Sequence, residues 1–223
     1  MVKDLKNVQK RLNRYLAKDF LATRPGGGSK LTYIEGQSAI QLANKIFGFE
    51  GWSTEIKEMT QVVMEEYERA GSVKYNAGYL CRTKITVKVK NNNGTVETVS
   101  KEDIGFGSGE GMASKIKAIE SATKEAVTDS LKRVLRQLGN ALGNCCYDKK
   151  FLNFLKKTDG QEMKEFGKLL TREEMNTWKD DEEGNSMMKS KQIEENKTNI
   201  EEPKSNRDNT FQETDIDFES LNV

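Results

Sequence analysis

The 223-residue sequence contains no histidine. This excludes chemistry that needs an imidazole, namely Ser-His and Cys-His nucleophilic catalysis, His-ligated zinc and imidazole proton shuttling. Metal sites built on carboxylates stay open. Only three cysteines occur, Cys81, Cys145 and Cys146, and none lies in a CxxC spacing. Because adjacent cysteines have poor geometry for an ordinary disulfide, we expect free thiols in a reducing compartment.

Long apolar runs are missing as well. No stretch approaches the roughly 18 apolar residues of a membrane span, and residues 1–16 show no secretory hydrophobic region. We therefore expect an intracellular protein. Hydrophobic residues make up 35% of the chain and charged residues 32%, so the core is expected to occupy only part of the length.

The sequence also lacks a complete phosphate-binding loop. Residues 105–111 read GFGSGEG, with glycine at alternate positions. A Walker loop needs a Gly-Lys pair, which is not present here, and the GxGxxG pattern fails at its last glycine from either starting point. We interpret this stretch as a glycine-rich turn that lets a helix cross closely over a sheet.

The net charge of +1 conceals an uneven distribution. Residues 181–223 carry a net charge of −7, and the preceding 180 residues carry +8. A basic body indicates nucleic acid as its partner, and the acidic, apolar-poor tail is predicted to be disordered. Apolar residues return among the last acids, where they predict a partner-binding motif or a tail that shields the basic body: Phe211, Ile216, Phe218 and Leu221.

The strongest helical signal covers residues 114–144. Apolar residues recur there at steps of three and four, which predicts a helix with one buried face. Lys132, Arg133 and Arg136 fall on the opposite side. Asp129 precedes the first two at ion-pair spacing, so the pattern fits either a solvated salt-bridged face or a surface for an anionic partner.

Two helices are predicted before residue 52. Residues 2–21 have the apolar spacing of one helix, and residues 37–47 have that of a second, with Gly48 as its stop. Residues 23–29 contain a proline followed by three glycines, which we interpret as neither helix nor strand.

Strict alternation over residues 73–89 predicts a long strand with one packed face and five cations on the other. A strand opening at Trp52 precedes it, and a turn at 91–94 leads to a returning strand through Val96. The order predicts an α+β fold in which an antiparallel sheet packs against the long helix. The strand at 73–89 would expose apolar edges in a monomer, which indicates a homo-oligomer.

Three stretches resemble one family of proteins: residues 33–52, 102–115 and 124–144. They are similar to the Rad-fifty-two family of single-strand annealing proteins, and the resemblance covers about residues 20–155. It implies a nuclear homologous-recombination and double-strand break repair protein that has no catalytic residues and no cofactor. It also implies a subunit of a closed homo-oligomeric ring, of about ten copies, with single-stranded DNA in a basic groove around the outside.

The same resemblance assigns DNA-binding positions. Those of the inner groove are Arg24, Tyr33, Thr128, Lys132, Arg133 and Arg136. Lys90 and Lys149 match an outer site, where the family's lysine before the long helix is replaced by Ala113 and a later basic position by Asn153. Lys115 is the substitute that we expect there.

The resemblance and composition together divide the chain into a DNA-binding and oligomerisation domain at 1–160, a peripheral helix within 161–180 and the tail at 181–223. Long members of the family carry a large C-terminal half that binds the recombinase and the single-strand-binding replication protein. Because the part after the core is short here, we expect annealing rather than mediator activity, with the replication protein favoured over the recombinase as the partner of the tail.

Two other functions fit parts of the pattern. A sheet covered by a helix with a basic end would also serve a double-stranded RNA-binding module. A metal-dependent nuclease would use acids such as Glu102, Asp103 and Glu110. Preference for single-stranded DNA over duplex RNA, and the absence of magnesium-dependent cleavage, would separate annealing from these alternatives.

Overall fold

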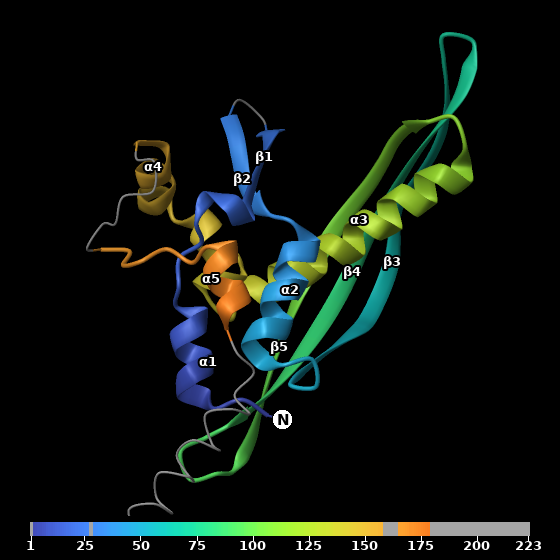
Figure 1. Ribbon diagram of the computed structural model, residues 1–223. Helices are drawn as coiled ribbons and strands as arrows, with labels where there is room; N and C mark the ends of the chain where they lie inside the picture. The colour runs from blue at the N-terminus through green and yellow to red at the C-terminus, as the bar shows by residue number, and fades with distance from the viewer. Residues whose placement is uncertain (1, 27–28, 158–164, 179–223) are drawn as a thin grey trace, which may run out of the picture. The chain divides into compact units, whose positions relative to one another are not determined.

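The computed structural model describes residues 2–26, 29–157 and 165–178 (Figure 1). The helices and strands in this part are α1 (Leu5–Leu12), β1 (Leu21–Gly26), β2 (Ser29–Ile34), α2 (Gly36–Phe47), β3 (Trp52–Arg69), β4 (Ser72–Lys90), β5 (Val96–Met112), α3 (Lys115–Arg136), α4 (Lys149–Lys157) and α5 (Arg172–Thr177). Three short 3-10 turns accompany them, η1 (Lys18–Phe20), η2 (Asn140–Leu142) and η3 (Asn144–Tyr147).

Three strands form an antiparallel sheet in the order β3-β4-β5. The turn at 91–94 joins β4 to β5, and Gly94 adopts a φ of 88° there. The next element, α3, lies along β4 and β5 (Figure 1). The hairpin of β1 and β2 forms a separate two-stranded sheet. The α+β prediction, with an antiparallel sheet packed against a long helix, is therefore confirmed.

The central strand β4 confirms the strand predicted at 73–89. Cys81, Thr83 and Ile85 are buried, whereas Arg82 and Lys88 on the opposite face are exposed. The hydroxyl oxygens of Thr83 and Ser130 lie 2.6 Å apart, in a buried hydrogen bond that ties β4 to α3. Because β4 is paired on both sides, the expectation that it would expose its edges is wrong, and the edges belong to β3 and β5.

Glycine at alternate positions of β5 brings α3 very close to the sheet. Gly105, Gly107 and Gly109 face α3, and a Cβ at any of them would collide with the helix backbone. Two strand residues advance about 6.6 Å and four helix residues about 6.0 Å, so the two repeats stay in step. The facing residues on the helix are small and buried: Ala118, Ala122, Ala126 and Ser130.

The glycine run is thus a strand, and the turn predicted at 105–111 is wrong, although the close helix crossing is confirmed. The helix predicted over 114–144 also ends early, at Arg136. Gly143 adopts a φ of 101°, which a right-handed helix does not allow. Leu142 is therefore buried from a 3-10 turn instead of from the long helix.

The single helix predicted over 2–21 is wrong beyond Leu12. Leu16 fits the helical period but is buried in an extended segment that pairs with Leu170. The Leu170 N–H donates to the Tyr15 carbonyl at 2.7 Å, and the Ala17 N–H donates to the Leu170 carbonyl at 2.8 Å. A partner distant in sequence therefore overrides the local pattern.

The interpretation of residues 23–29 as neither helix nor strand is also wrong where the structure describes them, at 23–26 and 29. Arg24 and Pro25 belong to β1 and pair with Leu31 and Lys30 of β2. A two-stranded hairpin leaves alternate N–H groups outside its ladder, so it tolerates proline.

One core joins the helical part of the chain to the end of the sheet. Its largest fully buried side chains come from segments spread along the chain: Leu16, Phe20, Leu42, Ile46, Phe47, Ile85, Leu135, Leu142, Phe151 and Leu170. All three cysteines are free, as predicted, and all three are buried.

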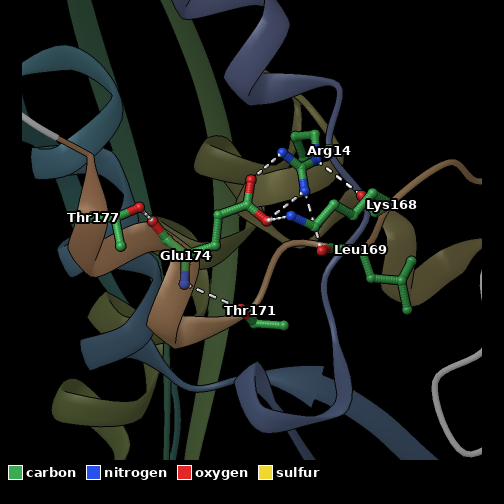
Figure 2. A network of polar contacts seen from close by, with 6 residues as sticks. All are labelled: Arg14, Lys168, Leu169, Thr171, Glu174 and Thr177. Carbon is green, nitrogen blue, oxygen red and sulfur yellow. Dashed lines mark hydrogen bonds and ion pairs between the residues drawn. The ribbon is translucent and has the colours of Figure 1, made fainter.

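Residues 165–178 dock on this core through Arg14 (Figure 2). Arg14 donates to both carboxylate oxygens of Glu174, at 2.7 and 3.0 Å, and to the carbonyl oxygens of Lys168 and Leu169. Thr171 caps α5 by accepting the Glu174 N–H. The hydrogen bond from Arg14 holds the pKa of Glu174 below its usual value, so the pair is ionised at neutral pH.

A second arginine holds the same segment against the start of the hairpin. Arg172 donates from its backbone N–H to the Asp19 carboxylate at 2.7 Å and from its guanidinium to the Asp19 carbonyl and the Ser38 hydroxyl. The guanidinium also lies over the Phe20 ring, 4.7 Å from its centroid. Because Leu21 opens β1, this contact fixes the base of the hairpin that carries Arg24.

The domain boundaries at 160 and 180 remain predictions. The tail and its motif of Phe211, Ile216, Phe218 and Leu221 lie outside the described residues. Within the described ranges, no helix is long and apolar enough to cross a membrane.

Candidate nucleic-acid interface

Two adjoining hollows lie where the β1–β2 hairpin faces α3. The larger has a volume of about 780 Å³ and the smaller about 90 Å³. Arg24, Tyr33, Asp129 and Lys132 line both. We call the two hollows together the hairpin groove.

All six residues predicted for the inner groove line the hairpin groove: Arg24 from β1, Tyr33 from β2, and Thr128, Lys132, Arg133 and Arg136 from α3. The structure thus brings side chains of the β1–β2 hairpin together with side chains of α3, which lies far from the hairpin in the sequence. It places them in one solvent-accessible depression, and their role in binding DNA remains a prediction.

Tyr33 organises the middle of the groove. The Arg24 guanidinium lies 5.7 Å from the centroid of its ring, and the Lys132 ammonium lies 5.4 Å from it. An aromatic face attracts a cation, so one ring holds two like charges that would otherwise repel. Within the described ranges Arg24 and Lys132 make no ion pair, and their charges are available to an anion.

Unlike Arg24 and Lys132, Arg133 forms an ion pair within the described part of the protein. Its Nε donates to Asp103 of β5 at 3.3 Å, and Gln137 donates to the same carboxylate at 2.9 Å. Partial burial would raise the pKa of Asp103, but the hydrogen bonds from Gln137 and the Ile104 N–H, with the charge of Arg133, hold that pKa below its usual value. Arg133 therefore enters the groove with part of its charge already neutralised.

In the part of the chain that the structure describes, the α3 carboxylates Asp129 and Glu125 bind backbone groups of β5 and not the cations of their own helix. Asp129 accepts the Phe106 N–H at 3.3 Å, and Glu125 accepts the Ser108 N–H at 2.9 Å. Both N–H groups belong to β5, an edge of the sheet. The acids thus satisfy backbone donors at that edge, and within the described ranges they form none of the ion pairs with Lys132 and Arg133 that the spacing left open.

Lys124 and Tyr147 are among the groove residues that the sequence patterns did not single out. Lys124 lines the larger hollow and forms an ion pair with Glu120. Its spacing of four from Thr128 places it on the same helix face, a signal that was sufficient to find it. Tyr147 lines the smaller hollow beside Arg136, whose guanidinium lies 4.1 Å from the ring centroid. No periodic pattern leads to Tyr147, because it lies in η3 beyond the helix.

The three residues predicted for an outer site are not brought together within one copy of the chain. Lys90 ends β4 and pairs with Val96, while Lys115 opens α3 just after the far end of β5. About fifteen strand residues separate these ends, a distance of roughly 50 Å. Lys149 opens α4.

The acids of the alternative nuclease site are spread along β5. Glu102 and Asp103 point to opposite faces of the strand, because successive side chains alternate. Glu110 lies seven residues beyond Asp103, roughly 23 Å along the strand. In the residues that the structure describes, no group of three or more acidic or cysteine side chains has the geometry to hold a metal ion.

Comparison with known proteins places the sequence in a family. Residues 4–165 match the family model described as "Rad52/22 family double-strand break repair protein". The chain is 44% identical over 147 residues to the Kluyveromyces lactis protein named "DNA repair and recombination protein RAD52", which covers 66% of this chain and 31% of that relative.

Other yeast relatives give the same picture. The Saccharomyces cerevisiae protein of the same name is 44% identical over 66% of this chain and 29% of the relative. The Schizosaccharomyces pombe "DNA repair and recombination protein rad22" is 40% identical over 65% of this chain and 29% of the relative. The chain therefore spans about a third of the length of the curated relatives it matches.

Proposed function

Since this chain belongs to the Rad52/22 family of double-strand break repair proteins, we propose that it binds single-stranded DNA in the hairpin groove and anneals complementary strands. The setting is homologous recombination and double-strand break repair in the nucleus. One observation carries the proposal: Arg24, Lys132 and Arg136 line the groove and make no ion pair within the described ranges.

The groove contacts the sugar-phosphate backbone. Lysine and arginine side chains that neutralise phosphates release condensed counterions, and this gives affinity without reading the sequence. Glu35 also lines the larger hollow and adds a carboxylate beside the cations. It repels a phosphate near α2, which favours a strand path along Lys132 and Arg136.

Binding of DNA through its phosphates allows the chain to anneal complementary strands. A strand held by its backbone can present its base edges to solvent, where a complementary strand can pair with them. Base pairing supplies the free energy of the reaction, so the mechanism needs neither ATP nor a catalytic residue. The chain acts by holding and orienting DNA.

Assembly into a homo-oligomeric ring of about ten copies extends the groove over many nucleotides. In the part of the chain that the structure describes, one edge of the 18-residue strand β3 is unpaired, and Ile56, Met59 and Val62 are exposed on it. By contrast, Asp129 and Glu125 satisfy N–H groups of β5 at the other edge. On these grounds we assign the contact with a second copy to the β3 edge.

The decisive experiment compares affinity and annealing under matched salt. Fluorescence anisotropy measures binding of the full chain to mixed-sequence single-stranded DNA, duplex DNA and duplex RNA. A second assay follows the annealing of complementary labelled strands without ATP. We expect tighter binding to single-stranded DNA, accelerated annealing, and a logarithm of affinity that falls linearly with the logarithm of salt concentration. Preference for duplex RNA, or unchanged annealing, would overturn the proposal.

A further inference from the structure

Tyr147 is the most exposed aromatic side chain in the hairpin groove. Its exposed fraction is 64%, although its neighbours Cys145 and Cys146 are buried. Those neighbours anchor η3 in the core, and Gly143 before them has the positive φ that turns the chain. An exposed ring on an anchored backbone is an ordered surface that needs little rearrangement to receive a ligand.

Arg136 orients this ring. Its guanidinium lies 4.1 Å from the centroid of the Tyr147 ring, the shortest cation-to-ring distance among the described residues. Arginine stacks on aromatic faces while its N–H groups stay free to bind an anion. The pair therefore places an aromatic surface and a phosphate-binding group side by side.

The other tyrosine of the groove has a different environment. Tyr33 is half-buried, and both Arg24 and Lys132 approach its ring. Its ring serves to hold two cations in place. Tyr147 has one cation beside it and the larger part of its surface open to solvent.

We propose that Tyr147 is a base-stacking residue of the hairpin groove, receiving a nucleobase of the strand whose phosphate Arg136 binds. The inference rests on the proposed function and adds to it a contact with the base. Stacking suits annealing because it uses the flat face that every base has. The hydrogen-bonding edge of the stacked base stays free to pair.

The test separates contacts to bases from contacts to phosphates. It measures the affinity of the full-length wild type, Tyr147→Leu and Tyr147→Phe for a thymidine oligonucleotide and for an abasic oligonucleotide of equal length. Leucine keeps the apolar bulk without the ring, and phenylalanine keeps the ring. Lys132→Ala is the matched control for loss of a phosphate contact.

We expect Tyr147→Leu to weaken binding of the thymidine strand about tenfold and to leave abasic affinity and salt slope unchanged. Tyr147→Phe retains wild-type affinity for both strands, and Lys132→Ala weakens both and lowers the slope. Equal weakening of both strands by Tyr147→Leu would show that Tyr147 only supports Arg136, and unchanged affinity for the thymidine strand would equally reject stacking. If the wild type binds neither strand, the proposed function itself fails, and this inference fails with it.

Discussion

The ammonium of Lys132 lies 5.4 Å from the centroid of the Tyr33 ring, and this contact joins α3 to the β1–β2 hairpin. The same ring receives Arg24 at 5.7 Å. The two cations thus depend on one neutral aromatic surface for their spacing. Because the Tyr33 ring positions both Arg24 and Lys132, we expect the two cations to contact a bound DNA strand together.

The first prediction concerns the salt dependence of DNA binding. Lys132→Ala and Arg136→Ala each remove a phosphate contact, so each lowers the slope of log affinity against log salt by about 0.7. Arg133→Ala changes the slope less, because Asp103 already neutralises part of that charge. Anisotropy titrations of single-stranded DNA over a range of salt concentrations measure these slopes.

Lys10→Ala is the matched control for these variants, because Lys10 is an exposed lysine of α1 that lines neither hollow of the hairpin groove. We expect it to keep the wild-type affinity and slope. The groove assignment is wrong if the triple variant of Lys132, Arg133 and Arg136 binds as the wild type does.

The second prediction concerns the packing of α3 on β5. In Gly107→Ala the added Cβ would collide with the backbone of Ala122 and Ala126. The helix must move, which lowers the free energy of unfolding by about 1–3 kcal/mol or more. Ser108→Ala is the control, since Ser108 points away from the helix and its N–H bond to Glu125 remains. Urea denaturation of both variants measures the difference, and equal midpoints would contradict the close packing.

Elements with a strong repeating pattern were predictable from the sequence. The period of two in β4 and the period of three and four in α3 gave these elements because each buries one continuous face. The helical pattern placed Lys132, Arg133 and Arg136 on one face, but a salt-bridged face also fitted that spacing. The six groove residues were therefore assigned by the family resemblance. In the structure Asp129 and Glu125 accept backbone N–H groups of β5. That the helix face binds an anion remains a prediction.

The features that the sequence did not predict depend on contacts between segments that are distant in the chain. Leu16 continues a helical pattern but pairs with Leu170, so no local rule ends the first helix correctly. Gly105 and Gly107 look like turn residues until the small side chains of α3 are set against them. Tyr147 becomes a groove residue only because η3 turns it back beside Arg136.

The third prediction concerns stability at low pH. The hydrogen bond from Arg14 depresses the pKa of Glu174 in the folded chain. The pair therefore adds stability above the pKa of an unfolded glutamate, about 4.3, and this stability is lost as pH falls through the folded pKa. Glutamine at position 174 does not titrate. We therefore expect the Glu174→Gln variant to be about 1 kcal/mol less stable than the wild type at pH 7. The stabilities of the two proteins should converge in acid.

Thermal or urea unfolding from neutral to acidic pH measures this difference. Glu173→Gln serves as the control, because Glu173 is an exposed neighbour on the same helix. A gap between wild type and Glu174→Gln that stays constant with pH would show that the pair is not the source of the effect.

The fourth prediction concerns the tail, whose last residues combine apolar side chains with acids. We propose that they recruit the single-strand-binding replication protein, with the recombinase as the less favoured partner. Deleting residues 211–223 is then expected to leave annealing of naked DNA intact and to slow annealing of DNA coated with that protein. If the deletion instead tightens binding to naked DNA and coated DNA is annealed as before, the tail is a shield for the basic groove.

The last prediction concerns assembly through β3. This strand is an edge of the sheet in the described part of the chain, and Val62 on it is 45% exposed. An unpaired apolar edge is a template for another chain, and a charge placed on it opposes pairing. We expect the wild type to give a mass by light scattering that is a multiple of 25.2 kDa, and Val62→Lys to lower that mass.

Val99→Lys is the matched control, because Val99 on β5 is 41% exposed, close to the exposure of Val62. It adds the same charge at a similar apolar surface, but on the strand at the other edge of the sheet. If copies associate through β3, only Val62→Lys lowers the mass of the assembly. Its affinity for DNA then also falls, because each DNA strand contacts fewer hairpin grooves. A wild type that stays at 25.2 kDa with and without single-stranded DNA would reject assembly, and equal loss of mass in both variants would reject β3 as the interface.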